Sequence, residues 1–273
     1  MKLMPMLLDE TIREGVIAIA NAAAAEILAV YEQPFDVERK GDDSPLTAAD
    51  LASHHCIVDG LARLTPDIPV LSEESAVLPV AERRAWTRFW LVDPLDGTRE
   101  FVKRNGEFTV NIALIEDGVA VFGVIQAPVP DVLWWGDLAH GAYRRADGGE
   151  VPMEVRAPAV APIRVAASRS HRDARTEAFM ARMAADLGEL EDVTVGSSLK
   201  FCRIAEGAID IYPRFGPTSE WDTAAGQAIL EAAGGRVVDP QGRPFRYNQR
   251  DTLLNGDFVA FGDAKLNWRQ WAE

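Results

Sequence analysis

Two aspartates, Asp93 and Asp96, bracket a turn that follows an apolar run, and residues 90–98 read WLVDPLDGT. Pro94 has no backbone N–H for a strand ladder, so we expect the strand to end before it, while Gly97 permits a tight backbone path. The two carboxylates can therefore converge on one point. Carboxylates this close repel each other unless they share a proton or bind a divalent cation such as Mg²⁺, which takes oxygen ligands. The rest of the chain must decide between these two arrangements.

Acidic residues also occur at three other places where an element is expected to end or begin. Glu73 and Glu74 follow an apolar run, so they lie at a strand end, where active sites commonly form. Asp222, in the string WDTAAG, is expected at a helix N-cap, and Asp50 lies at another helix entrance. A solvated loop or a helix cap explains each of these residues when it is taken alone. No single cluster identifies a site.

The elements that must position these residues begin with two helices. Apolar residues at helical spacing predict helices over residues 9–31 and 49–64, separated by a polar loop at residues 40–47. Two short apolar runs, at residues 69–71 and 89–92, predict buried strands. The acidic residues of the first half are therefore expected at strand ends and at a helix entrance.

An antiparallel sheet is predicted next in the chain. Residues 107–114 alternate, with Val110 and Ile112 on one face and Thr109 and Asn111 on the other, which indicates a half-buried strand. The pair Asp117-Gly118 predicts a hairpin turn. Further strands of this sheet are expected at residues 119–126, 133–135 and 141–144.

The second half alternates strands and helices after a proline-containing crossover at residues 156–162, which indicates an α/β layer. We expect an N-terminal α+β domain at residues 1–160, with the antiparallel sheet and most of the acidic residues, and a C-terminal α/β domain at residues 161–273. Strands are expected at residues 164–167, 193–195, 208–212, 236–238 and 258–261, and helices at residues 176–187, from about 199, and 223–233.

Composition narrows the function classes. The chain has 273 residues, of which 48% are hydrophobic, and its formal charge of -14 disfavours polymeric nucleic acid as a partner. Its 2 cysteines, Cys56 and Cys202, exclude a disulfide framework and suit a reducing cytoplasm. The apolar segment 16–31 contains Asn21 and Glu26, so we expect a helix of a soluble protein and no transmembrane segment.

Three features of the sequence, taken together, resemble the lithium-sensitive, Mg²⁺-dependent phosphatases of the inositol monophosphatase superfamily. They are Glu73 with Glu74, the motif at residues 93–98, and Trp221 with Asp222. That superfamily includes inositol monophosphatases, fructose-1,6-bisphosphatases and 3'(2'),5'-bisphosphate nucleotidases. The resemblance spans nearly the whole chain and implies an α+β fold, the layered α/β/α/β/α sandwich of the inositol monophosphatase and fructose-1,6-bisphosphatase type. Inhibition by Li⁺ is expected from the resemblance alone.

The resemblance also implies roles for individual residues. Two or three Mg²⁺ ions are expected: Glu73, Asp93 and the carbonyl of Leu95 would ligate a first, and Asp93, Asp96 and Asp222 a second. Glu74 would orient waters, and Thr98, paired with Asp50, would take the proton of the attacking water. The stretch Asp96, Gly97 and Thr98 opens a short helix whose N-terminus would receive phosphate oxygens. The implied reaction is in-line hydrolysis of a phosphomonoester without a covalent intermediate.

Three further strings are similar to the bacterial 3'(2'),5'-bisphosphate nucleotidases of sulfate assimilation, which hydrolyse 3'-phosphoadenosine 5'-phosphate to AMP. They are KRNGEFTVNIA at residues 103–113, GSSLKFC at 196–202 and YPRFGP at 212–217. A bisphosphate needs cations away from the metals, and Ser197, Ser198, Lys200 and Arg214 are the candidates. Without the resemblance, a capping pair of serines and two surface charges explain these residues equally well.

Weaker candidates and rival functions complete these expectations. His171 is a minor candidate near the nucleotide, and His54 and His55 are expected to have no chemical role. The rivals are an inositol or sugar monophosphatase with the same metal site, a noncatalytic binder of phosphorylated metabolites, and an unrelated acidic protein whose carboxylates only cap helices. We expect a cytoplasmic enzyme whose partner is a small phosphorylated nucleotide. Peripheral association with the inner face of the membrane and the oligomeric state are left open.

Overall fold

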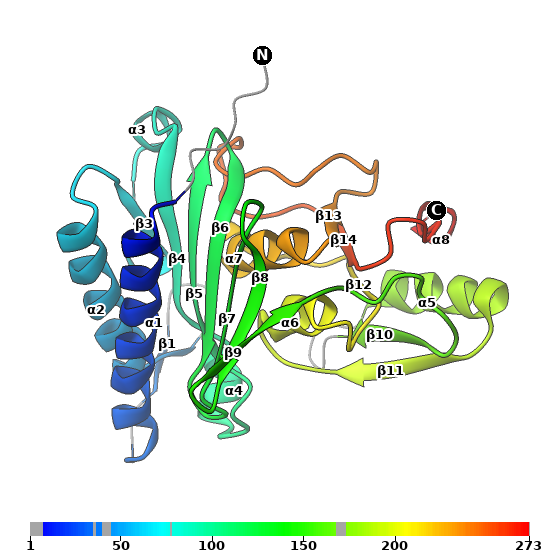
Figure 1. Ribbon diagram of the computed structural model, residues 1–273, viewed down its shortest axis with the longest axis horizontal. Helices are drawn as coiled ribbons and strands as arrows, with labels where there is room; N and C mark the ends of the chain where they lie inside the picture. Colours follow the sequence, from blue (N-terminus) through cyan, green and yellow to red (C-terminus); the bar gives the residue numbers. More distant parts are fainter. Residues whose placement is uncertain (1–7, 35–36, 40–44, 77, 168–172, 273) are drawn as a thin grey trace.

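The computed structural model describes residues 8–34, 37–39, 45–76, 78–167 and 173–272. Its elements form five layers, in the order helices, sheet, helices, sheet, helices, as Figure 1 shows. The predicted α/β/α/β/α sandwich is confirmed. Each layer presents an apolar face to its neighbours, and three clusters of buried residues fill the spaces between the layers.

The first layer contains α1 (Glu10–Tyr31) and α2 (Ala48–Leu64). Asp9 caps α1 by accepting a hydrogen bond from the Thr11 N–H at 2.8 Å. By length and hydropathy α1 passes the test for a membrane span, but one of its faces packs against α2 and the first sheet, with Val16, Ala20 and Ile27 fully buried. One face of α1 is therefore buried inside the protein.

The first sheet has seven strands in sequence order from β3 to β9, and only β3 and β4 run parallel. The predicted hairpin joins β5 and β6, and its turn residues Asp117 and Gly118 both have positive φ. The strands are β3 (Val70–Ser72), β4 (Arg88–Asp96), β5 (Thr109–Glu116), β6 (Val119–Ala127), β7 (Val132–Asp137), β8 (Gly141–Ala146) and β9 (Gly149–Met153), the last of which was not predicted.

Two predictions about this sheet are wrong. The β5 strand is not half-buried: Thr109 and Asn111 are at most 1% exposed, because helices cover both faces of the sheet. The β4 strand does not end before Pro94 but continues to Asp96. Between the pairs Asp93–Asn111 and Asp96–Thr109 the register shifts, so two residues of β4 lie opposite one of β5. Proline is tolerated at such a bulge because the ladder is interrupted there.

The middle layer contains α6 (Leu199–Ala205) and α7 (Glu220–Ala232), which lie between the two sheets (Figure 1). The α7 helix packs closely on β5 and β6. A Cβ atom at Gly123 in β6 would collide with the backbone of Ala225 in α7, so this contact requires a glycine. Because α7 belongs to the second half of the chain yet packs on the first sheet, the division into domains 1–160 and 161–273 stays a prediction.

The second sheet has the order β11-β10-β12-β14-β13, with parallel pairs around β10 and antiparallel pairs around β14. On its outer face lie α5 (Ala174–Leu187) and α8 (Arg269–Ala272). The strands are β10 (Ile163–Ala167), β11 (Leu190–Thr194), β12 (Ile211–Arg214), β13 (Arg236–Val238) and β14 (Phe258–Phe261).

Short elements complete the fold. Part of the predicted loop 40–47 forms β2 (Pro45–Leu46), which pairs with β1 (Glu38–Arg39), and residues 40–44 lie outside the described residues. A 3-10 turn, η1 (Glu73–Ser75), follows β3, and two five-residue helices follow, α3 (Val80–Arg84) and α4 (Thr98–Val102).

Candidate active site

The β4 bulge positions the two aspartates of the opening motif. Asp93 is 2% exposed, and one of its oxygens accepts the Leu95 N–H at 3.1 Å. The Ser53 hydroxyl donates to the Pro94 carbonyl at 2.7 Å, which fastens α2 to the bulge. An extra residue in one strand re-aims the side chains beside it. The bulge thus holds Asp93 and Asp96 against the protein interior without a break in the strand.

Register places a third carboxylate beside them. β3 runs parallel to β4 with Ser72 opposite Val92, so Glu73 follows at the level of Asp93 on the neighbouring strand. Glu73 and Glu74 begin η1 and are partly buried, in agreement with the predicted position at a strand end.

Asp222 supplies a fourth carboxylate from the start of α7, but the predicted N-cap position is wrong. The cap is Ser219, and Asp222 is the third helical residue of a capping box, in which its Oδ2 accepts the Ser219 N–H at 2.8 Å. The helix begins earlier than predicted because residues 220–222 add a turn that Ser219 caps. One oxygen of Asp222 is thereby fixed by its own helix.

Mutual repulsion shows that these carboxylates form one cluster. Burial, followed by the charges of Glu73, Asp96 and Asp222, raises the pKa of Asp93 well above its usual range. Burial and then Asp96 raise the pKa of Asp222 to about 8, and burial raises the pKa of Asp96 to about 6. The cluster therefore favours either bound protons or a cation, the two arrangements that the sequence left open.

The donor set fits a hard divalent cation, because every group is an oxygen. Asp93, Asp96 and Asp222 each give one oxygen to a backbone N–H, with Ser198 as the donor to Asp96 at 2.6 Å. In the part of the chain that the structure describes, no three acidic, His or Cys side chains stand in the close arrangement of a metal cage. Ligation therefore requires the carboxylates to turn toward a common point.

Thr98 and Asp50 lie together, as expected. The Thr98 hydroxyl is 3.4 Å from Asp50 Oδ1 and 3.3 Å from the Leu95 carbonyl, two acceptors between which its single proton can alternate. Asp50 is 1% exposed, and its other oxygen accepts both the N–H and the hydroxyl of Thr47 in the α2 capping box. Gly97 caps α4 with a φ of 92°, a conformation that favours glycine.

Lys200 and Arg214 are not surface charges, since they are 5% and 7% exposed. Burial lowers the pKa of Lys200 to about 8, although the charge of Asp96 opposes the shift. The charge of Arg214 opposes the rise that burial causes in the pKa of Asp222, so both cations lie beside the acidic cluster. The Lys200 Nζ donates to the Ser197 carbonyl at 3.0 Å, and Arg214 donates to the Pro217 carbonyl at 2.9 Å.

The two serines join α6 to the bulge region. Ser198 is the N-cap residue of α6 but makes no side-chain cap bond. Its hydroxyl contacts Thr109 and Asn111, both at 2.8 Å. The Ser197 hydroxyl lies 3.0 Å from the Asp96 carbonyl, which it can donate to. The polar face of β5 therefore meets these serines and not solvent, a partnership that strand periodicity could not reveal.

Sequence reasoning missed two groups near the site. The imidazole Nδ1 of His54, a residue expected to have no chemical role, lies 2.9 Å from the Ser72 hydroxyl next to Glu73. Burial lowers the pKa of His54. Glu220 is fully buried two residues before Asp222, and only its place beside an aspartate in the sequence could have signalled it. His171 lies outside the described residues.

Comparisons with known proteins match the chain to one family over most of its length. A model of the inositol monophosphatase family matches residues 8–267. The chain is 49% identical over 248 residues to the 3'(2'),5'-bisphosphate nucleotidase CysQ of Escherichia coli K12, which covers 90% of this chain and 97% of the relative. It is 42% identical to the CysQ of Buchnera aphidicola, with 90% of this chain and 92% of that relative covered.

Solved structures share the fold of this chain. The crystal structure of CysQ from Bacteroides thetaiotaomicron superposes with a TM-score of 0.79 at 41% identity, covering 91% of this chain and 96% of that one. The Thermotoga maritima IMPase superposes with a TM-score of 0.75 at 22% identity, covering 92% and 91% of the two chains, and this likeness concerns the fold alone.

Proposed function

The chain belongs to the inositol monophosphatase family, and we propose that it is a 3'(2'),5'-bisphosphate nucleotidase that releases the 3'-phosphate of 3'-phosphoadenosine 5'-phosphate. The observation that carries this proposal is identity near 50% with bisphosphate nucleotidases over nine-tenths of the chain. The products are AMP and inorganic phosphate, which suits a role in nucleotide recycling during sulfate assimilation.

We infer that Mg²⁺ binds at the acidic cluster. Its ligands are Glu73, Asp93, the Leu95 carbonyl, Asp96 and Asp222, in a set for two or three ions. Mg²⁺ held by these residues would lower the pKa of a bound water and neutralise charge on the phosphate and the leaving oxygen. The repulsion within the cluster supports this assignment, because a cation relieves it.

The protein's own residues move the proton. The attacking water donates a proton to the Thr98 Oγ1 while the Thr98 proton passes to Asp50 Oδ1, 3.4 Å away. Asp50 is held for this role by its two bonds from Thr47. Glu74 orients water beside Glu73. The start of α4 at Thr98, which follows Gly97, would receive the phosphate oxygens.

The 5'-phosphate is bound by Lys200 and Arg214, with Ser197 and Ser198 at the same wall. Burying two cations is unfavourable unless anions accompany them. In the described residues Arg214 Nε is buried without a hydrogen-bond partner, and Lys200 donates to a neutral carbonyl. A phosphate would satisfy both groups with charge-assisted hydrogen bonds.

The substrate assignment is tested by initial rates with Mg²⁺ on 3'-phosphoadenosine 5'-phosphate, inositol 1-phosphate, fructose 1,6-bisphosphate and histidinol phosphate. We expect the nucleotide to have the highest kcat/KM. A faster reaction with inositol 1-phosphate would establish the rival monophosphatase, and the absence of turnover on all four would favour a noncatalytic binder.

The two unpaired cysteines support a cytoplasmic location, and nothing in the described residues supports attachment to a membrane face.

A further inference from the structure

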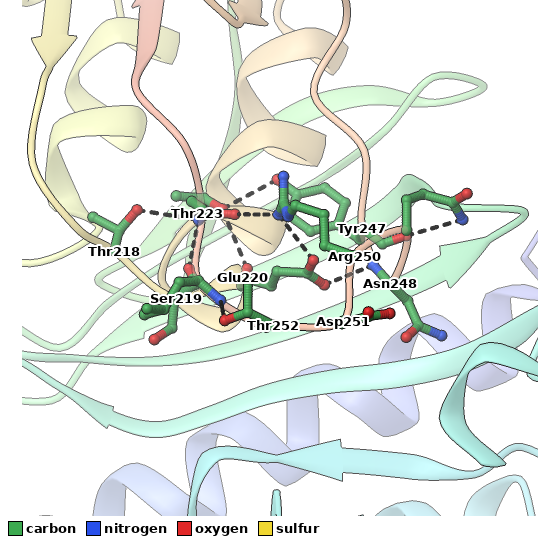
Figure 2. Close-up of polar contacts among 12 residues, drawn as sticks. Thr218, Ser219, Glu220, Thr223, Tyr247, Asn248, Arg250, Asp251 and Thr252 are labelled. Atoms are coloured by element: carbon green, nitrogen blue, oxygen red, sulfur yellow. Dashed lines mark hydrogen bonds and ion pairs between the residues drawn. The ribbon is translucent and has the colours of Figure 1, made fainter. Parts of the chain in front are cut away.

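A largely buried polar network lies beside the first turn of α7, which carries Asp222. Its members are Arg83 of α3, Glu220 of α7, and Asn248, Arg250 and Asn255 of the segment between β13 and β14; we refer to these five residues as the clamp. Figure 2 shows Glu220 reaching toward Arg250 and Asn248 beneath the start of α7.

Glu220 is the centre of the clamp. It is 0% exposed, and its two oxygens accept the Asn248 N–H at 2.7 Å and the Arg250 guanidinium at 2.9 Å. Its own N–H donates to the Leu253 carbonyl at 2.8 Å. A carboxylate buried this completely is costly unless each oxygen is paired, and here both are. The segment 248–253 is thereby fixed to the first turn of α7.

One arm of the clamp leads to Asp222. Arg250 donates to the Asn255 side-chain oxygen at 3.0 Å, and the Asn255 amide donates to the Ser219 carbonyl at 2.7 Å and to Thr223 at 3.0 Å. Ser219 is the residue whose N–H holds Asp222 at 2.8 Å. The position of the Asp222 carboxylate therefore depends on Glu220 through a continuous chain of hydrogen bonds.

The other arm leads to Arg83 of α3. Arg83 is 2% exposed and donates to the Asn248 side chain at 2.6 Å and to the carbonyls of Arg250 and Asp251 at 2.9 and 2.6 Å. The Asn248 amide donates back to the Arg83 carbonyl at 2.6 Å. α3 is the next helix after η1, and Ala76 and Leu78 between them pack on the core.

We propose that Glu220 is a positioning residue, which through the clamp fixes Ser219 and the Asp222 carboxylate held by the Ser219 N–H, and so sets the affinity of the acidic cluster for divalent metal. This inference rests on the proposed function. It assigns no chemical step to Glu220, which is enclosed by protein. Groups that hold metal ligands in place typically change metal affinity by about 10-fold to 100-fold when they are replaced.

The test measures Mn²⁺ binding to the protein without substrate, by the loss of the free Mn²⁺ electron paramagnetic resonance signal. Glu220→Gln keeps the shape of the side chain but places an amide N–H₂ against a donor. We expect its Mn²⁺ Kd to rise about 10-fold. We also expect kcat at fixed, subsaturating Mg²⁺ to fall, while KM for 3'-phosphoadenosine 5'-phosphate stays within about twofold.

Two further variants keep the test sharp. Arg83→Lys retains the charge but loses the guanidinium fork, and we expect it to weaken Mn²⁺ binding in the same direction. Glu231→Gln removes another partly buried, hydrogen-bonded carboxylate from the opposite end of α7, and we expect an unchanged Kd. All measurements are made well below the Tm of each variant. If Glu220→Gln does not fold, Arg83→Lys tests the inference in its place.

The outcomes separate the two proposals. If the wild type binds Mn²⁺ and hydrolyses the nucleotide while Glu220→Gln and Arg83→Lys bind Mn²⁺ as tightly as it does, the clamp is only structural and this inference is wrong. If the wild type binds no Mn²⁺, the proposed function fails first.

Discussion

At the scale of single residues, the site is a balance between buried charges of opposite sign. Four carboxylates repel one another, and two buried cations lie beside them. The residue types could be identified from the sequence because two aspartates, a glycine and a threonine lie within residues 93–98. Their hydrogen-bond partners, such as Asn111 for Ser198, come from distant segments and could not be read from it.

Asp96→Asn should reduce kcat about 100-fold or more, because it removes a full charge from the proposed metal ligands while keeping the side chain's size. The measurement is phosphate release at saturating Mg²⁺ and substrate. The control is Asp239→Asn, at a surface turn beyond β13 where the carboxylate pairs with Arg243. Nearly intact activity in Asp96→Asn would show that the proposed ligand set is wrong.

Lys200→Ala should raise KM for 3'-phosphoadenosine 5'-phosphate about tenfold, because it removes a charge-assisted hydrogen bond to the 5'-phosphate. On 3'-AMP, which lacks that phosphate, we expect KM within about twofold of the wild type. Lys265→Ala changes an exposed lysine and serves as the control. Equal effects on both substrates would remove Lys200 from the 5'-phosphate.

Without divalent cations, stability should fall as pH rises from about 4 to about 8. The folded-state pKa of Asp222 is raised from 3.8 to about 8 and that of Asp96 to about 6, so the folded state holds more protons than the unfolded state across this window. Each proton lost then disfavours the folded state. The free energy of unfolding in urea, measured with and without Mg²⁺, tests this: Mg²⁺ should flatten the slope. Stability that rises over the window in metal-free buffer would contradict the account.

At the scale of elements, periodicity and turn chemistry predicted most helices and strands correctly, since each depends on neighbouring residues. The errors have tertiary causes. Pro94 was expected to end β4, but the bulge opposite β5 accommodates it. Thr109 and Asn111 were expected on the exposed face of a half-buried strand, but both side chains contact the hydroxyl of Ser198, the N-cap residue of α6. Polar residues on a strand indicate a polar neighbour, and water is only one such neighbour.

The contact between β6 and α7 is the element-scale feature most open to mutation. Gly123→Ala would push a methyl group into the Ala225 backbone and should lower the free energy of unfolding by about 1–3 kcal/mol. Gly149→Ala, in β9, is the matched control because its nearest atom is 3.7 Å from the added Cβ. Urea denaturation of both variants gives the comparison, and equal stability would show that α7 does not need this close approach.

At the scale of the whole molecule, the layered arrangement makes the site possible. Asp93 belongs to the first sheet, Glu73 follows its strand β3, and Asp222 lies in the first turn of α7, the helix between the two sheets (Figure 1). The sequence predicted the layers through family resemblance and alternation of elements. It could not predict how α7 of the second half packs on the first sheet, because that contact joins residues about 100 positions apart.

The central claim is that carboxylates from these separate elements together bind divalent metal. Isothermal titration calorimetry of Mg²⁺ into the protein at pH 8 with AMP and phosphate present tests it most directly, alongside Asp93→Asn and the surface control Asp239→Asn. We predict saturable binding at two or more sites in the wild type and in Asp239→Asn, and at least tenfold weaker binding in Asp93→Asn. The absence of Mg²⁺ binding by the wild type, or equal binding by Asp93→Asn, would contradict the account.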